Sequence, residues 1–313
     1  MSVKKAKALK RPPRILPGDR VGVVAPAGPV EPALLEKGLS AISRMGWTPV
    51  VGRHVNARDR FLAGSDEARA ADLMCMFENT EIRAIFCARG GYGVNRLLPL
   101  LDAAVIRRHP KIVVGASDVT LLLLYLYQRC SLIAFHGPMV AGTFGRHSLR
   151  KTRGQFSGLL AGQPAATALE WSGARVLRAG KASGPLTGGC LTLLCRSLGT
   201  PYEVDTRGCI LIIEDVNEPP YKVDGMLWQL KAAGKFKGVK GVIVGEMVDC
   251  GKGRALRRWL DESFCEVFAD GNFPVLARLP LGHGKEMWTL PLGVKATLDA
   301  EAGTLSLAGC GVT

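Results

Sequence analysis

The sequence of 313 residues has no uninterrupted apolar run of about 18 residues, the length that a helix needs to cross a membrane. We therefore predict no membrane span and no membrane partner. The basic residues 1–14 are not followed by the apolar core of a secretory signal. These two absences favour a cytoplasmic protein.

Closely spaced cysteines are also missing, because none of the nine cysteines forms a Cys-x-x-Cys pair. Their odd number argues against a disulfide framework. Most have apolar neighbours, as Cys87 does, so we interpret them as reduced and buried. The five histidines show no metal-ligand spacing, and we predict no bound metal.

The sequence contains no Gly-x-Gly-x-x-Gly loop, so a dinucleotide is disfavoured and we predict no cofactor. Aromatic residues make up only 6% of the chain and are not interleaved with basic stretches. The net charge of +14 is scattered in pairs such as Arg107-Arg108. We therefore predict no nucleic-acid partner, and we interpret the charge as a surface property that attracts an anionic substrate.

What the sequence does contain, 47% apolar residues and 38 glycines, is typical of a packed, turn-rich globular protein. Residues 20–26 are predicted as a strand, 31–45 as a helix with apolar residues at helical spacing, and 47–53 as a second strand. This order of elements predicts an α/β fold with a parallel sheet.

The character of the chain changes after about residue 145, where a polar stretch contains no convincing strand. We predict a first domain over residues 1–150, a linker over 151–170 and a second domain over 171–313. In the second domain we expect residues 186–191 to open a helix that runs to Leu198. We also expect a buried strand at 240–244 that ends at the Gly-Glu pair following it.

The stretch Lys111–Thr120 is the most informative part of the sequence. A short run of apolar, β-branched residues is followed by a glycine, by Ser117-Asp118 and by an apolar segment long enough for a buried helix. This predicts a strand, a sharp turn and a helix with the serine at the bend, as in a nucleophile elbow. The usual second glycine after the serine is missing, and a Ser-Asp pair can also be a simple helix cap.

The glycine-rich bend Arg89–Gly93 follows another predicted strand. Such a bend exposes backbone N–H groups that suit an anion, although it can also be a plain tight turn. The amides of Gly91 and Asp118 are our candidates for an oxyanion hole.

A nucleophilic serine needs a general base, and that base needs an orienting carboxylate. His283, which lies between two glycines in a loop, is the best candidate base, and His136 at another strand end is its rival. Glu214 is the best carboxylate because it ends an apolar strand, where burial is costly without a partner. Asp215 and Glu218 are the alternatives.

Several stretches, in order from about Val21 to Gly293, cover most of the chain: VGVVAPAGPV, FLAGSDEARAADL, IFCARGGYGVNRLLPLLD, VVGASDVT, AFHGPM, GPLTGGCLTLL, LGTPYE, LIIEDVNEPPYKVDGMLWQL, GVIVGE and GHGKEMWTLPLG. In combination they resemble the LD-carboxypeptidase family of serine peptidases, which includes the microcin C7 self-immunity peptidases.

The resemblance implies a role for five residues: Ser117 as the nucleophile, Glu214 and His283 as its partners, and Gly91 and Asp118 as donors to the oxyanion. It implies a Rossmann-like N-terminal domain that carries the serine, joined to a smaller, β-rich C-terminal domain that carries the glutamate and the histidine. It further implies a homodimer.

On this resemblance we expect a serine carboxypeptidase that releases the C-terminal D-alanine of murein tetrapeptides in cell-wall recycling. An alternative is cleavage of peptidyl or aminoacyl nucleotides, where Trp288 could stack on a base unless it only packs in the core. A non-enzymatic alternative is a binder of small anions that uses the 89–93 bend and the helix after Ser117, but it leaves Glu214 and His283 without a role.

Two positions depart from the family pattern. Cys190 stands where asparagine is frequent, and Gly225 stands where arginine is frequent. Neither belongs to the three chemical residues, so we expect these departures to affect substrate fit and local packing.

Overall fold

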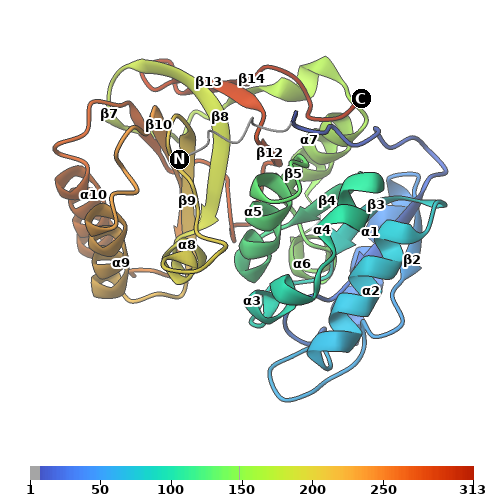
Figure 1. Ribbon diagram of the computed structural model, residues 1–313. Helices are drawn as coiled ribbons and strands as arrows, with labels where there is room; N and C mark the ends of the chain where they lie inside the picture. Colours follow the sequence, from blue (N-terminus) through green and yellow to red (C-terminus); the bar gives the residue numbers. More distant parts are fainter. Residues whose placement is uncertain (1–7, 148) are drawn as a thin grey trace.

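The computed structural model describes residues 8–147 and 149–313 (Figure 1). Part of the basic N-terminal stretch, residues 1–7, lies outside the described residues. Two sheets lie side by side, with the first half of the chain building most of one and the second half building the other. The predicted α/β architecture, with a mostly parallel N-terminal sheet and a mixed, β-rich C-terminal sheet, is confirmed.

The N-terminal sheet has six strands in the order β12-β5-β4-β3-β1-β2. Its strands are β1 (Arg20–Val24), β2 (Thr48–Val51), β3 (Ile82–Cys87), β4 (Ile112–Gly115), β5 (Ala134–His136) and β12 (Leu290–Leu292). All neighbours pair in parallel except β12, which runs antiparallel to β5. The central strands are buried apolar runs, as expected of a parallel sheet covered on both faces.

Helices connect these strands: α1 (Pro32–Arg44), α2 (Asp66–Glu78), α3 (Val94–Leu97), α4 (Ala103–Arg108), α5 (Thr120–Gln128), α6 (Gly145–His147) and α7 (Arg150–Leu160). Local sequence explains several of their ends. Pro32 is the first residue of α1, where its missing N–H is not needed. Ser65 caps α2 by accepting a hydrogen bond from the Ala68 N–H at 3.2 Å.

The C-terminal sheet has eight strands in the order β6-β14-β13-β8-β9-β10-β11-β7. Its strands are β6 (Ala168–Glu170), β7 (Arg175–Arg178), β8 (Lys181–Cys190), β9 (Ile210–Val216), β10 (Gly241–Val248), β11 (Val275–Ala277), β13 (Lys295–Asp299) and β14 (Thr304–Leu307). Strands β8, β9, β10 and β11 are parallel and the outer ones antiparallel. The helices are α8 (Leu191–Ser197), α9 (Pro220–Ala232) and α10 (Arg254–Val267).

The segment predicted as a linker, residues 151–170, contains most of α7 and the short strand β6. Phe156 of α7 packs edge-on against Trp47, Phe86 and Phe144 of the first half. Strand β6 pairs with β14 in the second sheet. The chain therefore passes from one sheet to the other within this segment, while the domain limits at 150 and 170 stay predictions.

Two expected element limits in the second half are wrong. Residues 186–190 continue β8 instead of opening a helix, and α8 begins only at Leu191. A Cβ on Gly188, whose φ is +114°, would stand 2.2 Å from the Ile212 carbonyl oxygen, so the glycine allows β8 to pair closely with β9. Strand β10 likewise continues beyond Gly245 to Val248, because it pairs with β9 again after an irregularity.

Strand β12 is an element that the sequence did not predict. Its three residues are buried, and they pair with β5 as the edge of the N-terminal sheet. The chain returns from the second half of the molecule to complete the first sheet (Figure 1). In the described parts of the chain, 8–147 and 149–313, we find no helix with the length and apolarity of a bilayer span.

Candidate active site

Ser117 lies at the sharp turn between β4 and α5, as predicted. It is a non-glycine residue with a positive φ of +59°, and it begins the short turn that leads into α5. Such a backbone conformation costs about 1–3 kcal/mol and persists only where neighbours impose it. Gly90 is one such neighbour, because a Cβ there would stand 2.6 Å from Ser117 Oγ. The serine hydroxyl therefore lies directly against the glycine-rich bend.

The glycine-rich bend is itself anchored to the turn that follows β1. Gly28 N–H donates to the Gly90 carbonyl oxygen at 3.1 Å, and Arg89 donates to the Pro29 carbonyl oxygen at 2.9 Å. Gly91 has a φ of +119°, and a Cβ on it would stand 3.1 Å from the Gly28 Cα. Only glycine suits this position, because both the backbone conformation and the close approach exclude a side chain.

Two buried side chains hold the far end of the bend. Arg69 donates to the carbonyl oxygens of Pro26, at 2.6 Å, and of Gly93, at 3.1 Å. The Asp118 carboxylate accepts a hydrogen bond from the Val94 N–H at 2.8 Å. Burial raises the pKa of Asp118 to about 6. The residue after the serine thus ties the serine turn to the bend through its side chain.

The backbone amides of Gly91 and Asp118 are free to bind a ligand. Across the described residues, neither N–H donates to another group of the protein. Free N–H groups beside a serine hydroxyl are what an oxyanion hole requires. Their assignment as oxyanion donors remains a prediction.

Glu214 and His283 form a hydrogen-bonded pair. Glu214 lies near the end of β9 and is completely buried, and the His283 Nδ1 donates to its Oε2 at 2.8 Å. Gly282 permits this contact: its φ is +97°, and a Cβ there would stand 2.1 Å from Glu214 Oε2. The glycine before the histidine is therefore a steric requirement of the pair.

Each member of the pair changes the pKa of the other. For His283, burial alone lowers the pKa, but the charge of Glu214 and their hydrogen bond raise it above its usual value. For Glu214, burial alone raises the pKa, but His283, with a further contribution from His136, brings it below its usual value. The pair resembles the base and the orienting acid of a serine hydrolase, with His283 Nε2 left for the nucleophile.

The end of β8 connects the serine turn to this pair. The Cys190 N–H donates to Thr120 Oγ1 at 3.2 Å, three residues after Ser117. Cys190 also pairs directly with Glu214 across β8 and β9. Within the described part of the chain, Ser117 Oγ and His283 are not hydrogen-bonded to each other.

His136, the rival base, lies inside the core at the end of β5. Neither of its ring nitrogens has a hydrogen-bond partner among the described residues, and the same is true of Glu214 Oε1. Burial lowers the pKa of His136, Glu214 opposes this, and His283 adds to it. His136 is completely buried and has no carboxylate partner in the described part of the chain, whereas the His283 side chain is 17% exposed and pairs with Glu214, so the geometry favours His283 as the base.

The two alternative carboxylates are engaged elsewhere. Asp215 caps α8 by accepting hydrogen bonds from Thr192 N–H, at 2.8 Å, and from its hydroxyl, at 2.9 Å. Glu218 lies 4.0 Å from the Lys222 ammonium. Glu214 is therefore the carboxylate of the three that has a histidine partner.

The structure also shows the environment of the three residues that we considered for substrate fit, Cys190, Gly225 and Trp288. Cys190 is buried with its thiol on Asp215 Oδ1 at 3.5 Å, and burial raises its pKa well above the usual value. A Cβ on Gly225 would meet no atom within 4 Å, so this position is open. Trp288 is only 6% exposed and packs edge-on against Trp171, at 6.3 Å between ring centroids.

Sequence reasoning missed Glu246, Arg69 and the side chain of Asp118. Glu246 lies beyond Gly245 in β10, and a Cβ on Gly284 would stand 1.4 Å from its Oε2. The signal for Glu246 was an acidic residue at the end of an apolar run, the same signal that pointed to Glu214. Arg69 had no such signal, because it lies in the middle of a helix.

A serine at a strand-to-helix turn, free amides beside it and a buried glutamate–histidine pair together define a candidate serine hydrolase site. Comparison with known proteins identifies the family. Residues 21–137 match the LD-carboxypeptidase N-terminal domain, and residues 183–298 match the LD-carboxypeptidase C-terminal domain. The chain belongs to the LD-carboxypeptidase family.

Relatives with similarity over almost the whole chain agree with this. The probable murein peptide carboxypeptidase of Bacillus subtilis is 36% identical over 294 residues, covering 92% of this chain and 91% of the relative. The murein tetrapeptide carboxypeptidase of Pseudomonas aeruginosa is 34% identical over 291 residues, covering 90% of this chain and 93% of the relative. The wild-type apo structure of the microcin C7 self-immunity protein MccF superposes with a TM-score of 0.89 at 26% identity, covering 97% and 100%.

Proposed function

We propose that this protein is a serine carboxypeptidase that releases the C-terminal D-alanine from murein tetrapeptides, with Ser117 as the nucleophile. The observation that carries the proposal is the hydrogen bond of 2.8 Å between His283 Nδ1 and Glu214 Oε2 in a chain of this family. The names of the two murein peptide carboxypeptidases to which it is similar support the choice of substrate.

In the proposed reaction, Ser117 Oγ attacks the carbonyl carbon of the bond before D-alanine, and its proton passes to His283 Nε2. The amides of Gly91 and Asp118 hold the negative oxygen that forms. Breakage of the C–N bond sends that proton to the leaving amine. Water then adds to the acyl carbon through the same base, and the Ser117 hydroxyl is restored. Glu214 keeps Nδ1 protonated and stabilises the imidazolium.

The test is D-alanine release from L-Ala-γ-D-Glu-meso-diaminopimelate-D-Ala, with wild type and Ser117→Ala compared. We expect release by wild type, and a loss on the order of 10³-fold or more in the variant. Circular dichroism and thermal melting check that the variant is folded. Release at the normal rate by Ser117→Ala would exclude this mechanism.

A second substrate is favoured by the structural similarity to MccF, which has also been solved in complex with aspartyl sulfamoyl adenosine. In that case the same three residues would cleave an aminoacyl or peptidyl nucleotide. Turnover of an aminoacyl sulfamoyl adenosine, without D-alanine release from the tetrapeptide, would select this second function.

We also propose that the protein is a homodimer, as the resemblance to the family implies. Light scattering after size-exclusion chromatography tests this, with twice the mass of 33.5 kDa expected. A single species at the mass of one chain would contradict it.

A further inference from the structure

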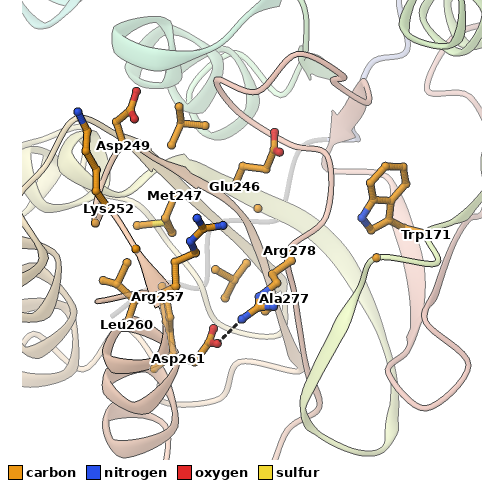
Figure 2. Close-up of a pocket in the computed structure, with 17 residues that line it drawn as sticks. Trp171, Glu246, Met247, Asp249, Lys252, Arg257, Leu260, Asp261, Ala277 and Arg278 are labelled. Carbon is orange, nitrogen blue, oxygen red and sulfur yellow. Dashed lines mark hydrogen bonds and ion pairs between the residues drawn. The ribbon is translucent and has the colours of Figure 1, made fainter. Parts of the chain in front are cut away.

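A cavity of about 630 Å³ lies at the carboxyl ends of β10 and β11, beside the first turns of α10 (Figure 2). Ligand pockets of α/β proteins are commonly found at the carboxyl ends of parallel strands, and this volume suits a small ligand. Ser117, Glu214 and His283 do not line the cavity. It touches the candidate active site through Gly245 and Glu246, since a Cβ on Gly245 would stand 3.0 Å from the Glu214 Cβ.

Glu246 is the group that the cavity shares with the histidine loop. Its Oε2 is shielded from solvent and has no hydrogen-bond partner among the described residues. That oxygen lies against the Gly284 backbone, one residue after His283. A buried carboxylate oxygen without a partner is costly, and a cation or a hydrogen-bond donor removes the cost. The position therefore suits the ammonium group of a ligand.

Cationic side chains face the same cavity. Arg278, which lines the cavity, shares the Asp261 carboxylate with Arg175, which does not line it, so a single negative charge lies between two guanidinium groups. In the described parts of the chain, Arg257 has no carboxylate within ion-pair distance. Figure 2 shows its guanidinium extending from α10 into the cavity, on the side where Glu246 lies. An unpaired guanidinium in a cavity suits a carboxylate, which it can bind through two hydrogen bonds.

Asp249 and Lys252 also line the cavity, so its wall carries acidic and basic groups together. Of these we take Glu246, which contacts the histidine loop, and Arg257 as the pair that defines the chemistry of the ligand. A carboxylate on one side and a guanidinium on the other match a zwitterion that carries both an ammonium and a carboxylate group. The side chain of meso-diaminopimelate ends in such an amino-acid group, whereas a lysine side chain ends in an ammonium alone. Trp171, on the opposite wall in Figure 2, adds an apolar surface for the methylene groups.

We propose that this cavity binds the zwitterionic side-chain end of a diaminopimelate residue on the acyl side of the scissile bond. Glu246 accepts hydrogen bonds from the ammonium, and Arg257 binds the carboxylate. The acyl side follows from the proposed substrate, in which diaminopimelate is the residue before the scissile bond. This inference rests on the proposed carboxypeptidase function and adds to it the means of choosing between cell-wall peptides.

The experiment measures kcat/KM for three tetrapeptides that differ only at the third residue: meso-diaminopimelate, L-lysine and L-norleucine. The variants are Arg257→Gln and Glu246→Gln. Arg254→Gln is the matched control, because Arg254 is an exposed residue of the same helix outside the cavity. Circular dichroism checks that each variant is folded.

Wild type should prefer the diaminopimelate peptide. Arg257→Gln should lower kcat/KM for that peptide about tenfold more than for the lysine peptide, since only the former has the side-chain carboxylate. Glu246→Gln should lower kcat/KM for both peptides with an ammonium about tenfold, and its effect should shrink with norleucine. Arg254→Gln should behave as wild type with all three.

Two results overturn the proposal in distinguishable ways. Suppose that wild type releases D-alanine but that Arg257→Gln changes kcat/KM by the same factor for all three substrates. The cavity then does not bind the side-chain carboxylate, and the inference is wrong. If wild type releases D-alanine from none of the three, the proposed function is wrong and the inference fails with it.

Discussion

At the scale of single residues, Glu214 and His283 stabilise each other. The directions of their pKa shifts define the pH range in which the pair stabilises the folded protein. Glu214 has a lowered pKa, so its contribution to stability is present above its usual value of 4.5 and is lost as the pH falls through the folded value. His283 has a raised pKa, so its contribution is present below its usual value of 6.5 and is lost as the pH rises through the folded value. The pair is therefore most stabilising between these two usual values.

Catalysis requires neutral His283, so activity should rise with pH through a pKa above the usual 6.5. Glu214→Gln removes the charge that raises this pKa. We expect the acid limb of kcat/KM to move to lower pH and kcat to fall on the order of 10³-fold. The checks are a pH–rate profile and an NMR titration of the imidazole, with His283→Gln to assign the signal. An unchanged pKa in Glu214→Gln would contradict the pairing.

Gly282→Ala tests the contact that a glycine permits. Its Cβ would stand 2.1 Å from Glu214 Oε2, so the pair must separate and we expect kcat to fall by about tenfold or more. Gly208→Ala is the control, because its φ of +73° is also unfavourable for alanine but no atom lies within 4 Å of its Cβ. Equal losses of activity in the two variants would show that backbone strain, and not displacement of Glu214, is responsible.

At the scale of elements, the glycine-rich bend Arg89–Gly93 is positioned by the segments around it. Gly28 and Arg69 donate hydrogen bonds to its carbonyl oxygens, and the Asp118 carboxylate accepts one from the Val94 N–H directly after it. Arg69 is the main support of the bend. It is only 2% exposed, it donates to two carbonyl oxygens, and it also pairs with the Asp66 carboxylate.

Arg69→Met should remove that support. It leaves buried acceptors without a donor, each costing about 1–3 kcal/mol, so we expect a lower free energy of unfolding and a lower kcat. Arg96→Met is the control, since Arg96 binds the same Asp66 at 2.8 Å from an exposed position and should have a small effect. Urea unfolding and D-alanine release measure both. A variant Arg69→Met with normal stability would refute this role.

At the scale of the whole molecule, the two sheets are joined by more than the segment between them. Strand β12 comes from the second half of the chain and completes the first sheet, and the end of β8 contacts the turn after Ser117. The family divides into an N-terminal and a C-terminal part, but the buried edge strand makes each part depend on the other.

We therefore expect one cooperative unfolding transition for the whole chain, with equal calorimetric and van't Hoff enthalpies. Leu290→Ala in β12 should shift the entire transition, by about 2–5 kcal/mol, because Leu290 is completely buried. Leu16→Ala, at a side chain 48% exposed, is the control and should have little effect. Two separate transitions in scanning calorimetry would show that the halves unfold independently.

Local patterns in the sequence predicted much of this architecture. The β-α-β order at the start and the strand–turn–helix around Ser117 depend on residues close together in the chain, so the sequence alone determined them. Glu214 and His283 were also predicted, because a carboxylate that ends an apolar strand and a histidine between glycines are visible locally. Their contact at 2.8 Å needed the folded chain.

Only the tertiary structure decided the features that join distant segments. Strand β12 was not predicted because three residues become a strand only when β5 offers a free edge. The predicted end of β8 was wrong because a glycine such as Gly188 locally indicates the end of a strand. In the fold, Gly188 instead allows β8 to approach β9 closely. Arg69 and Arg257 have no local signature, and the only local signal of Glu246 is its place at the end of an apolar run. Their roles come from the groups that the fold places around them, and burial decides how strongly those groups interact.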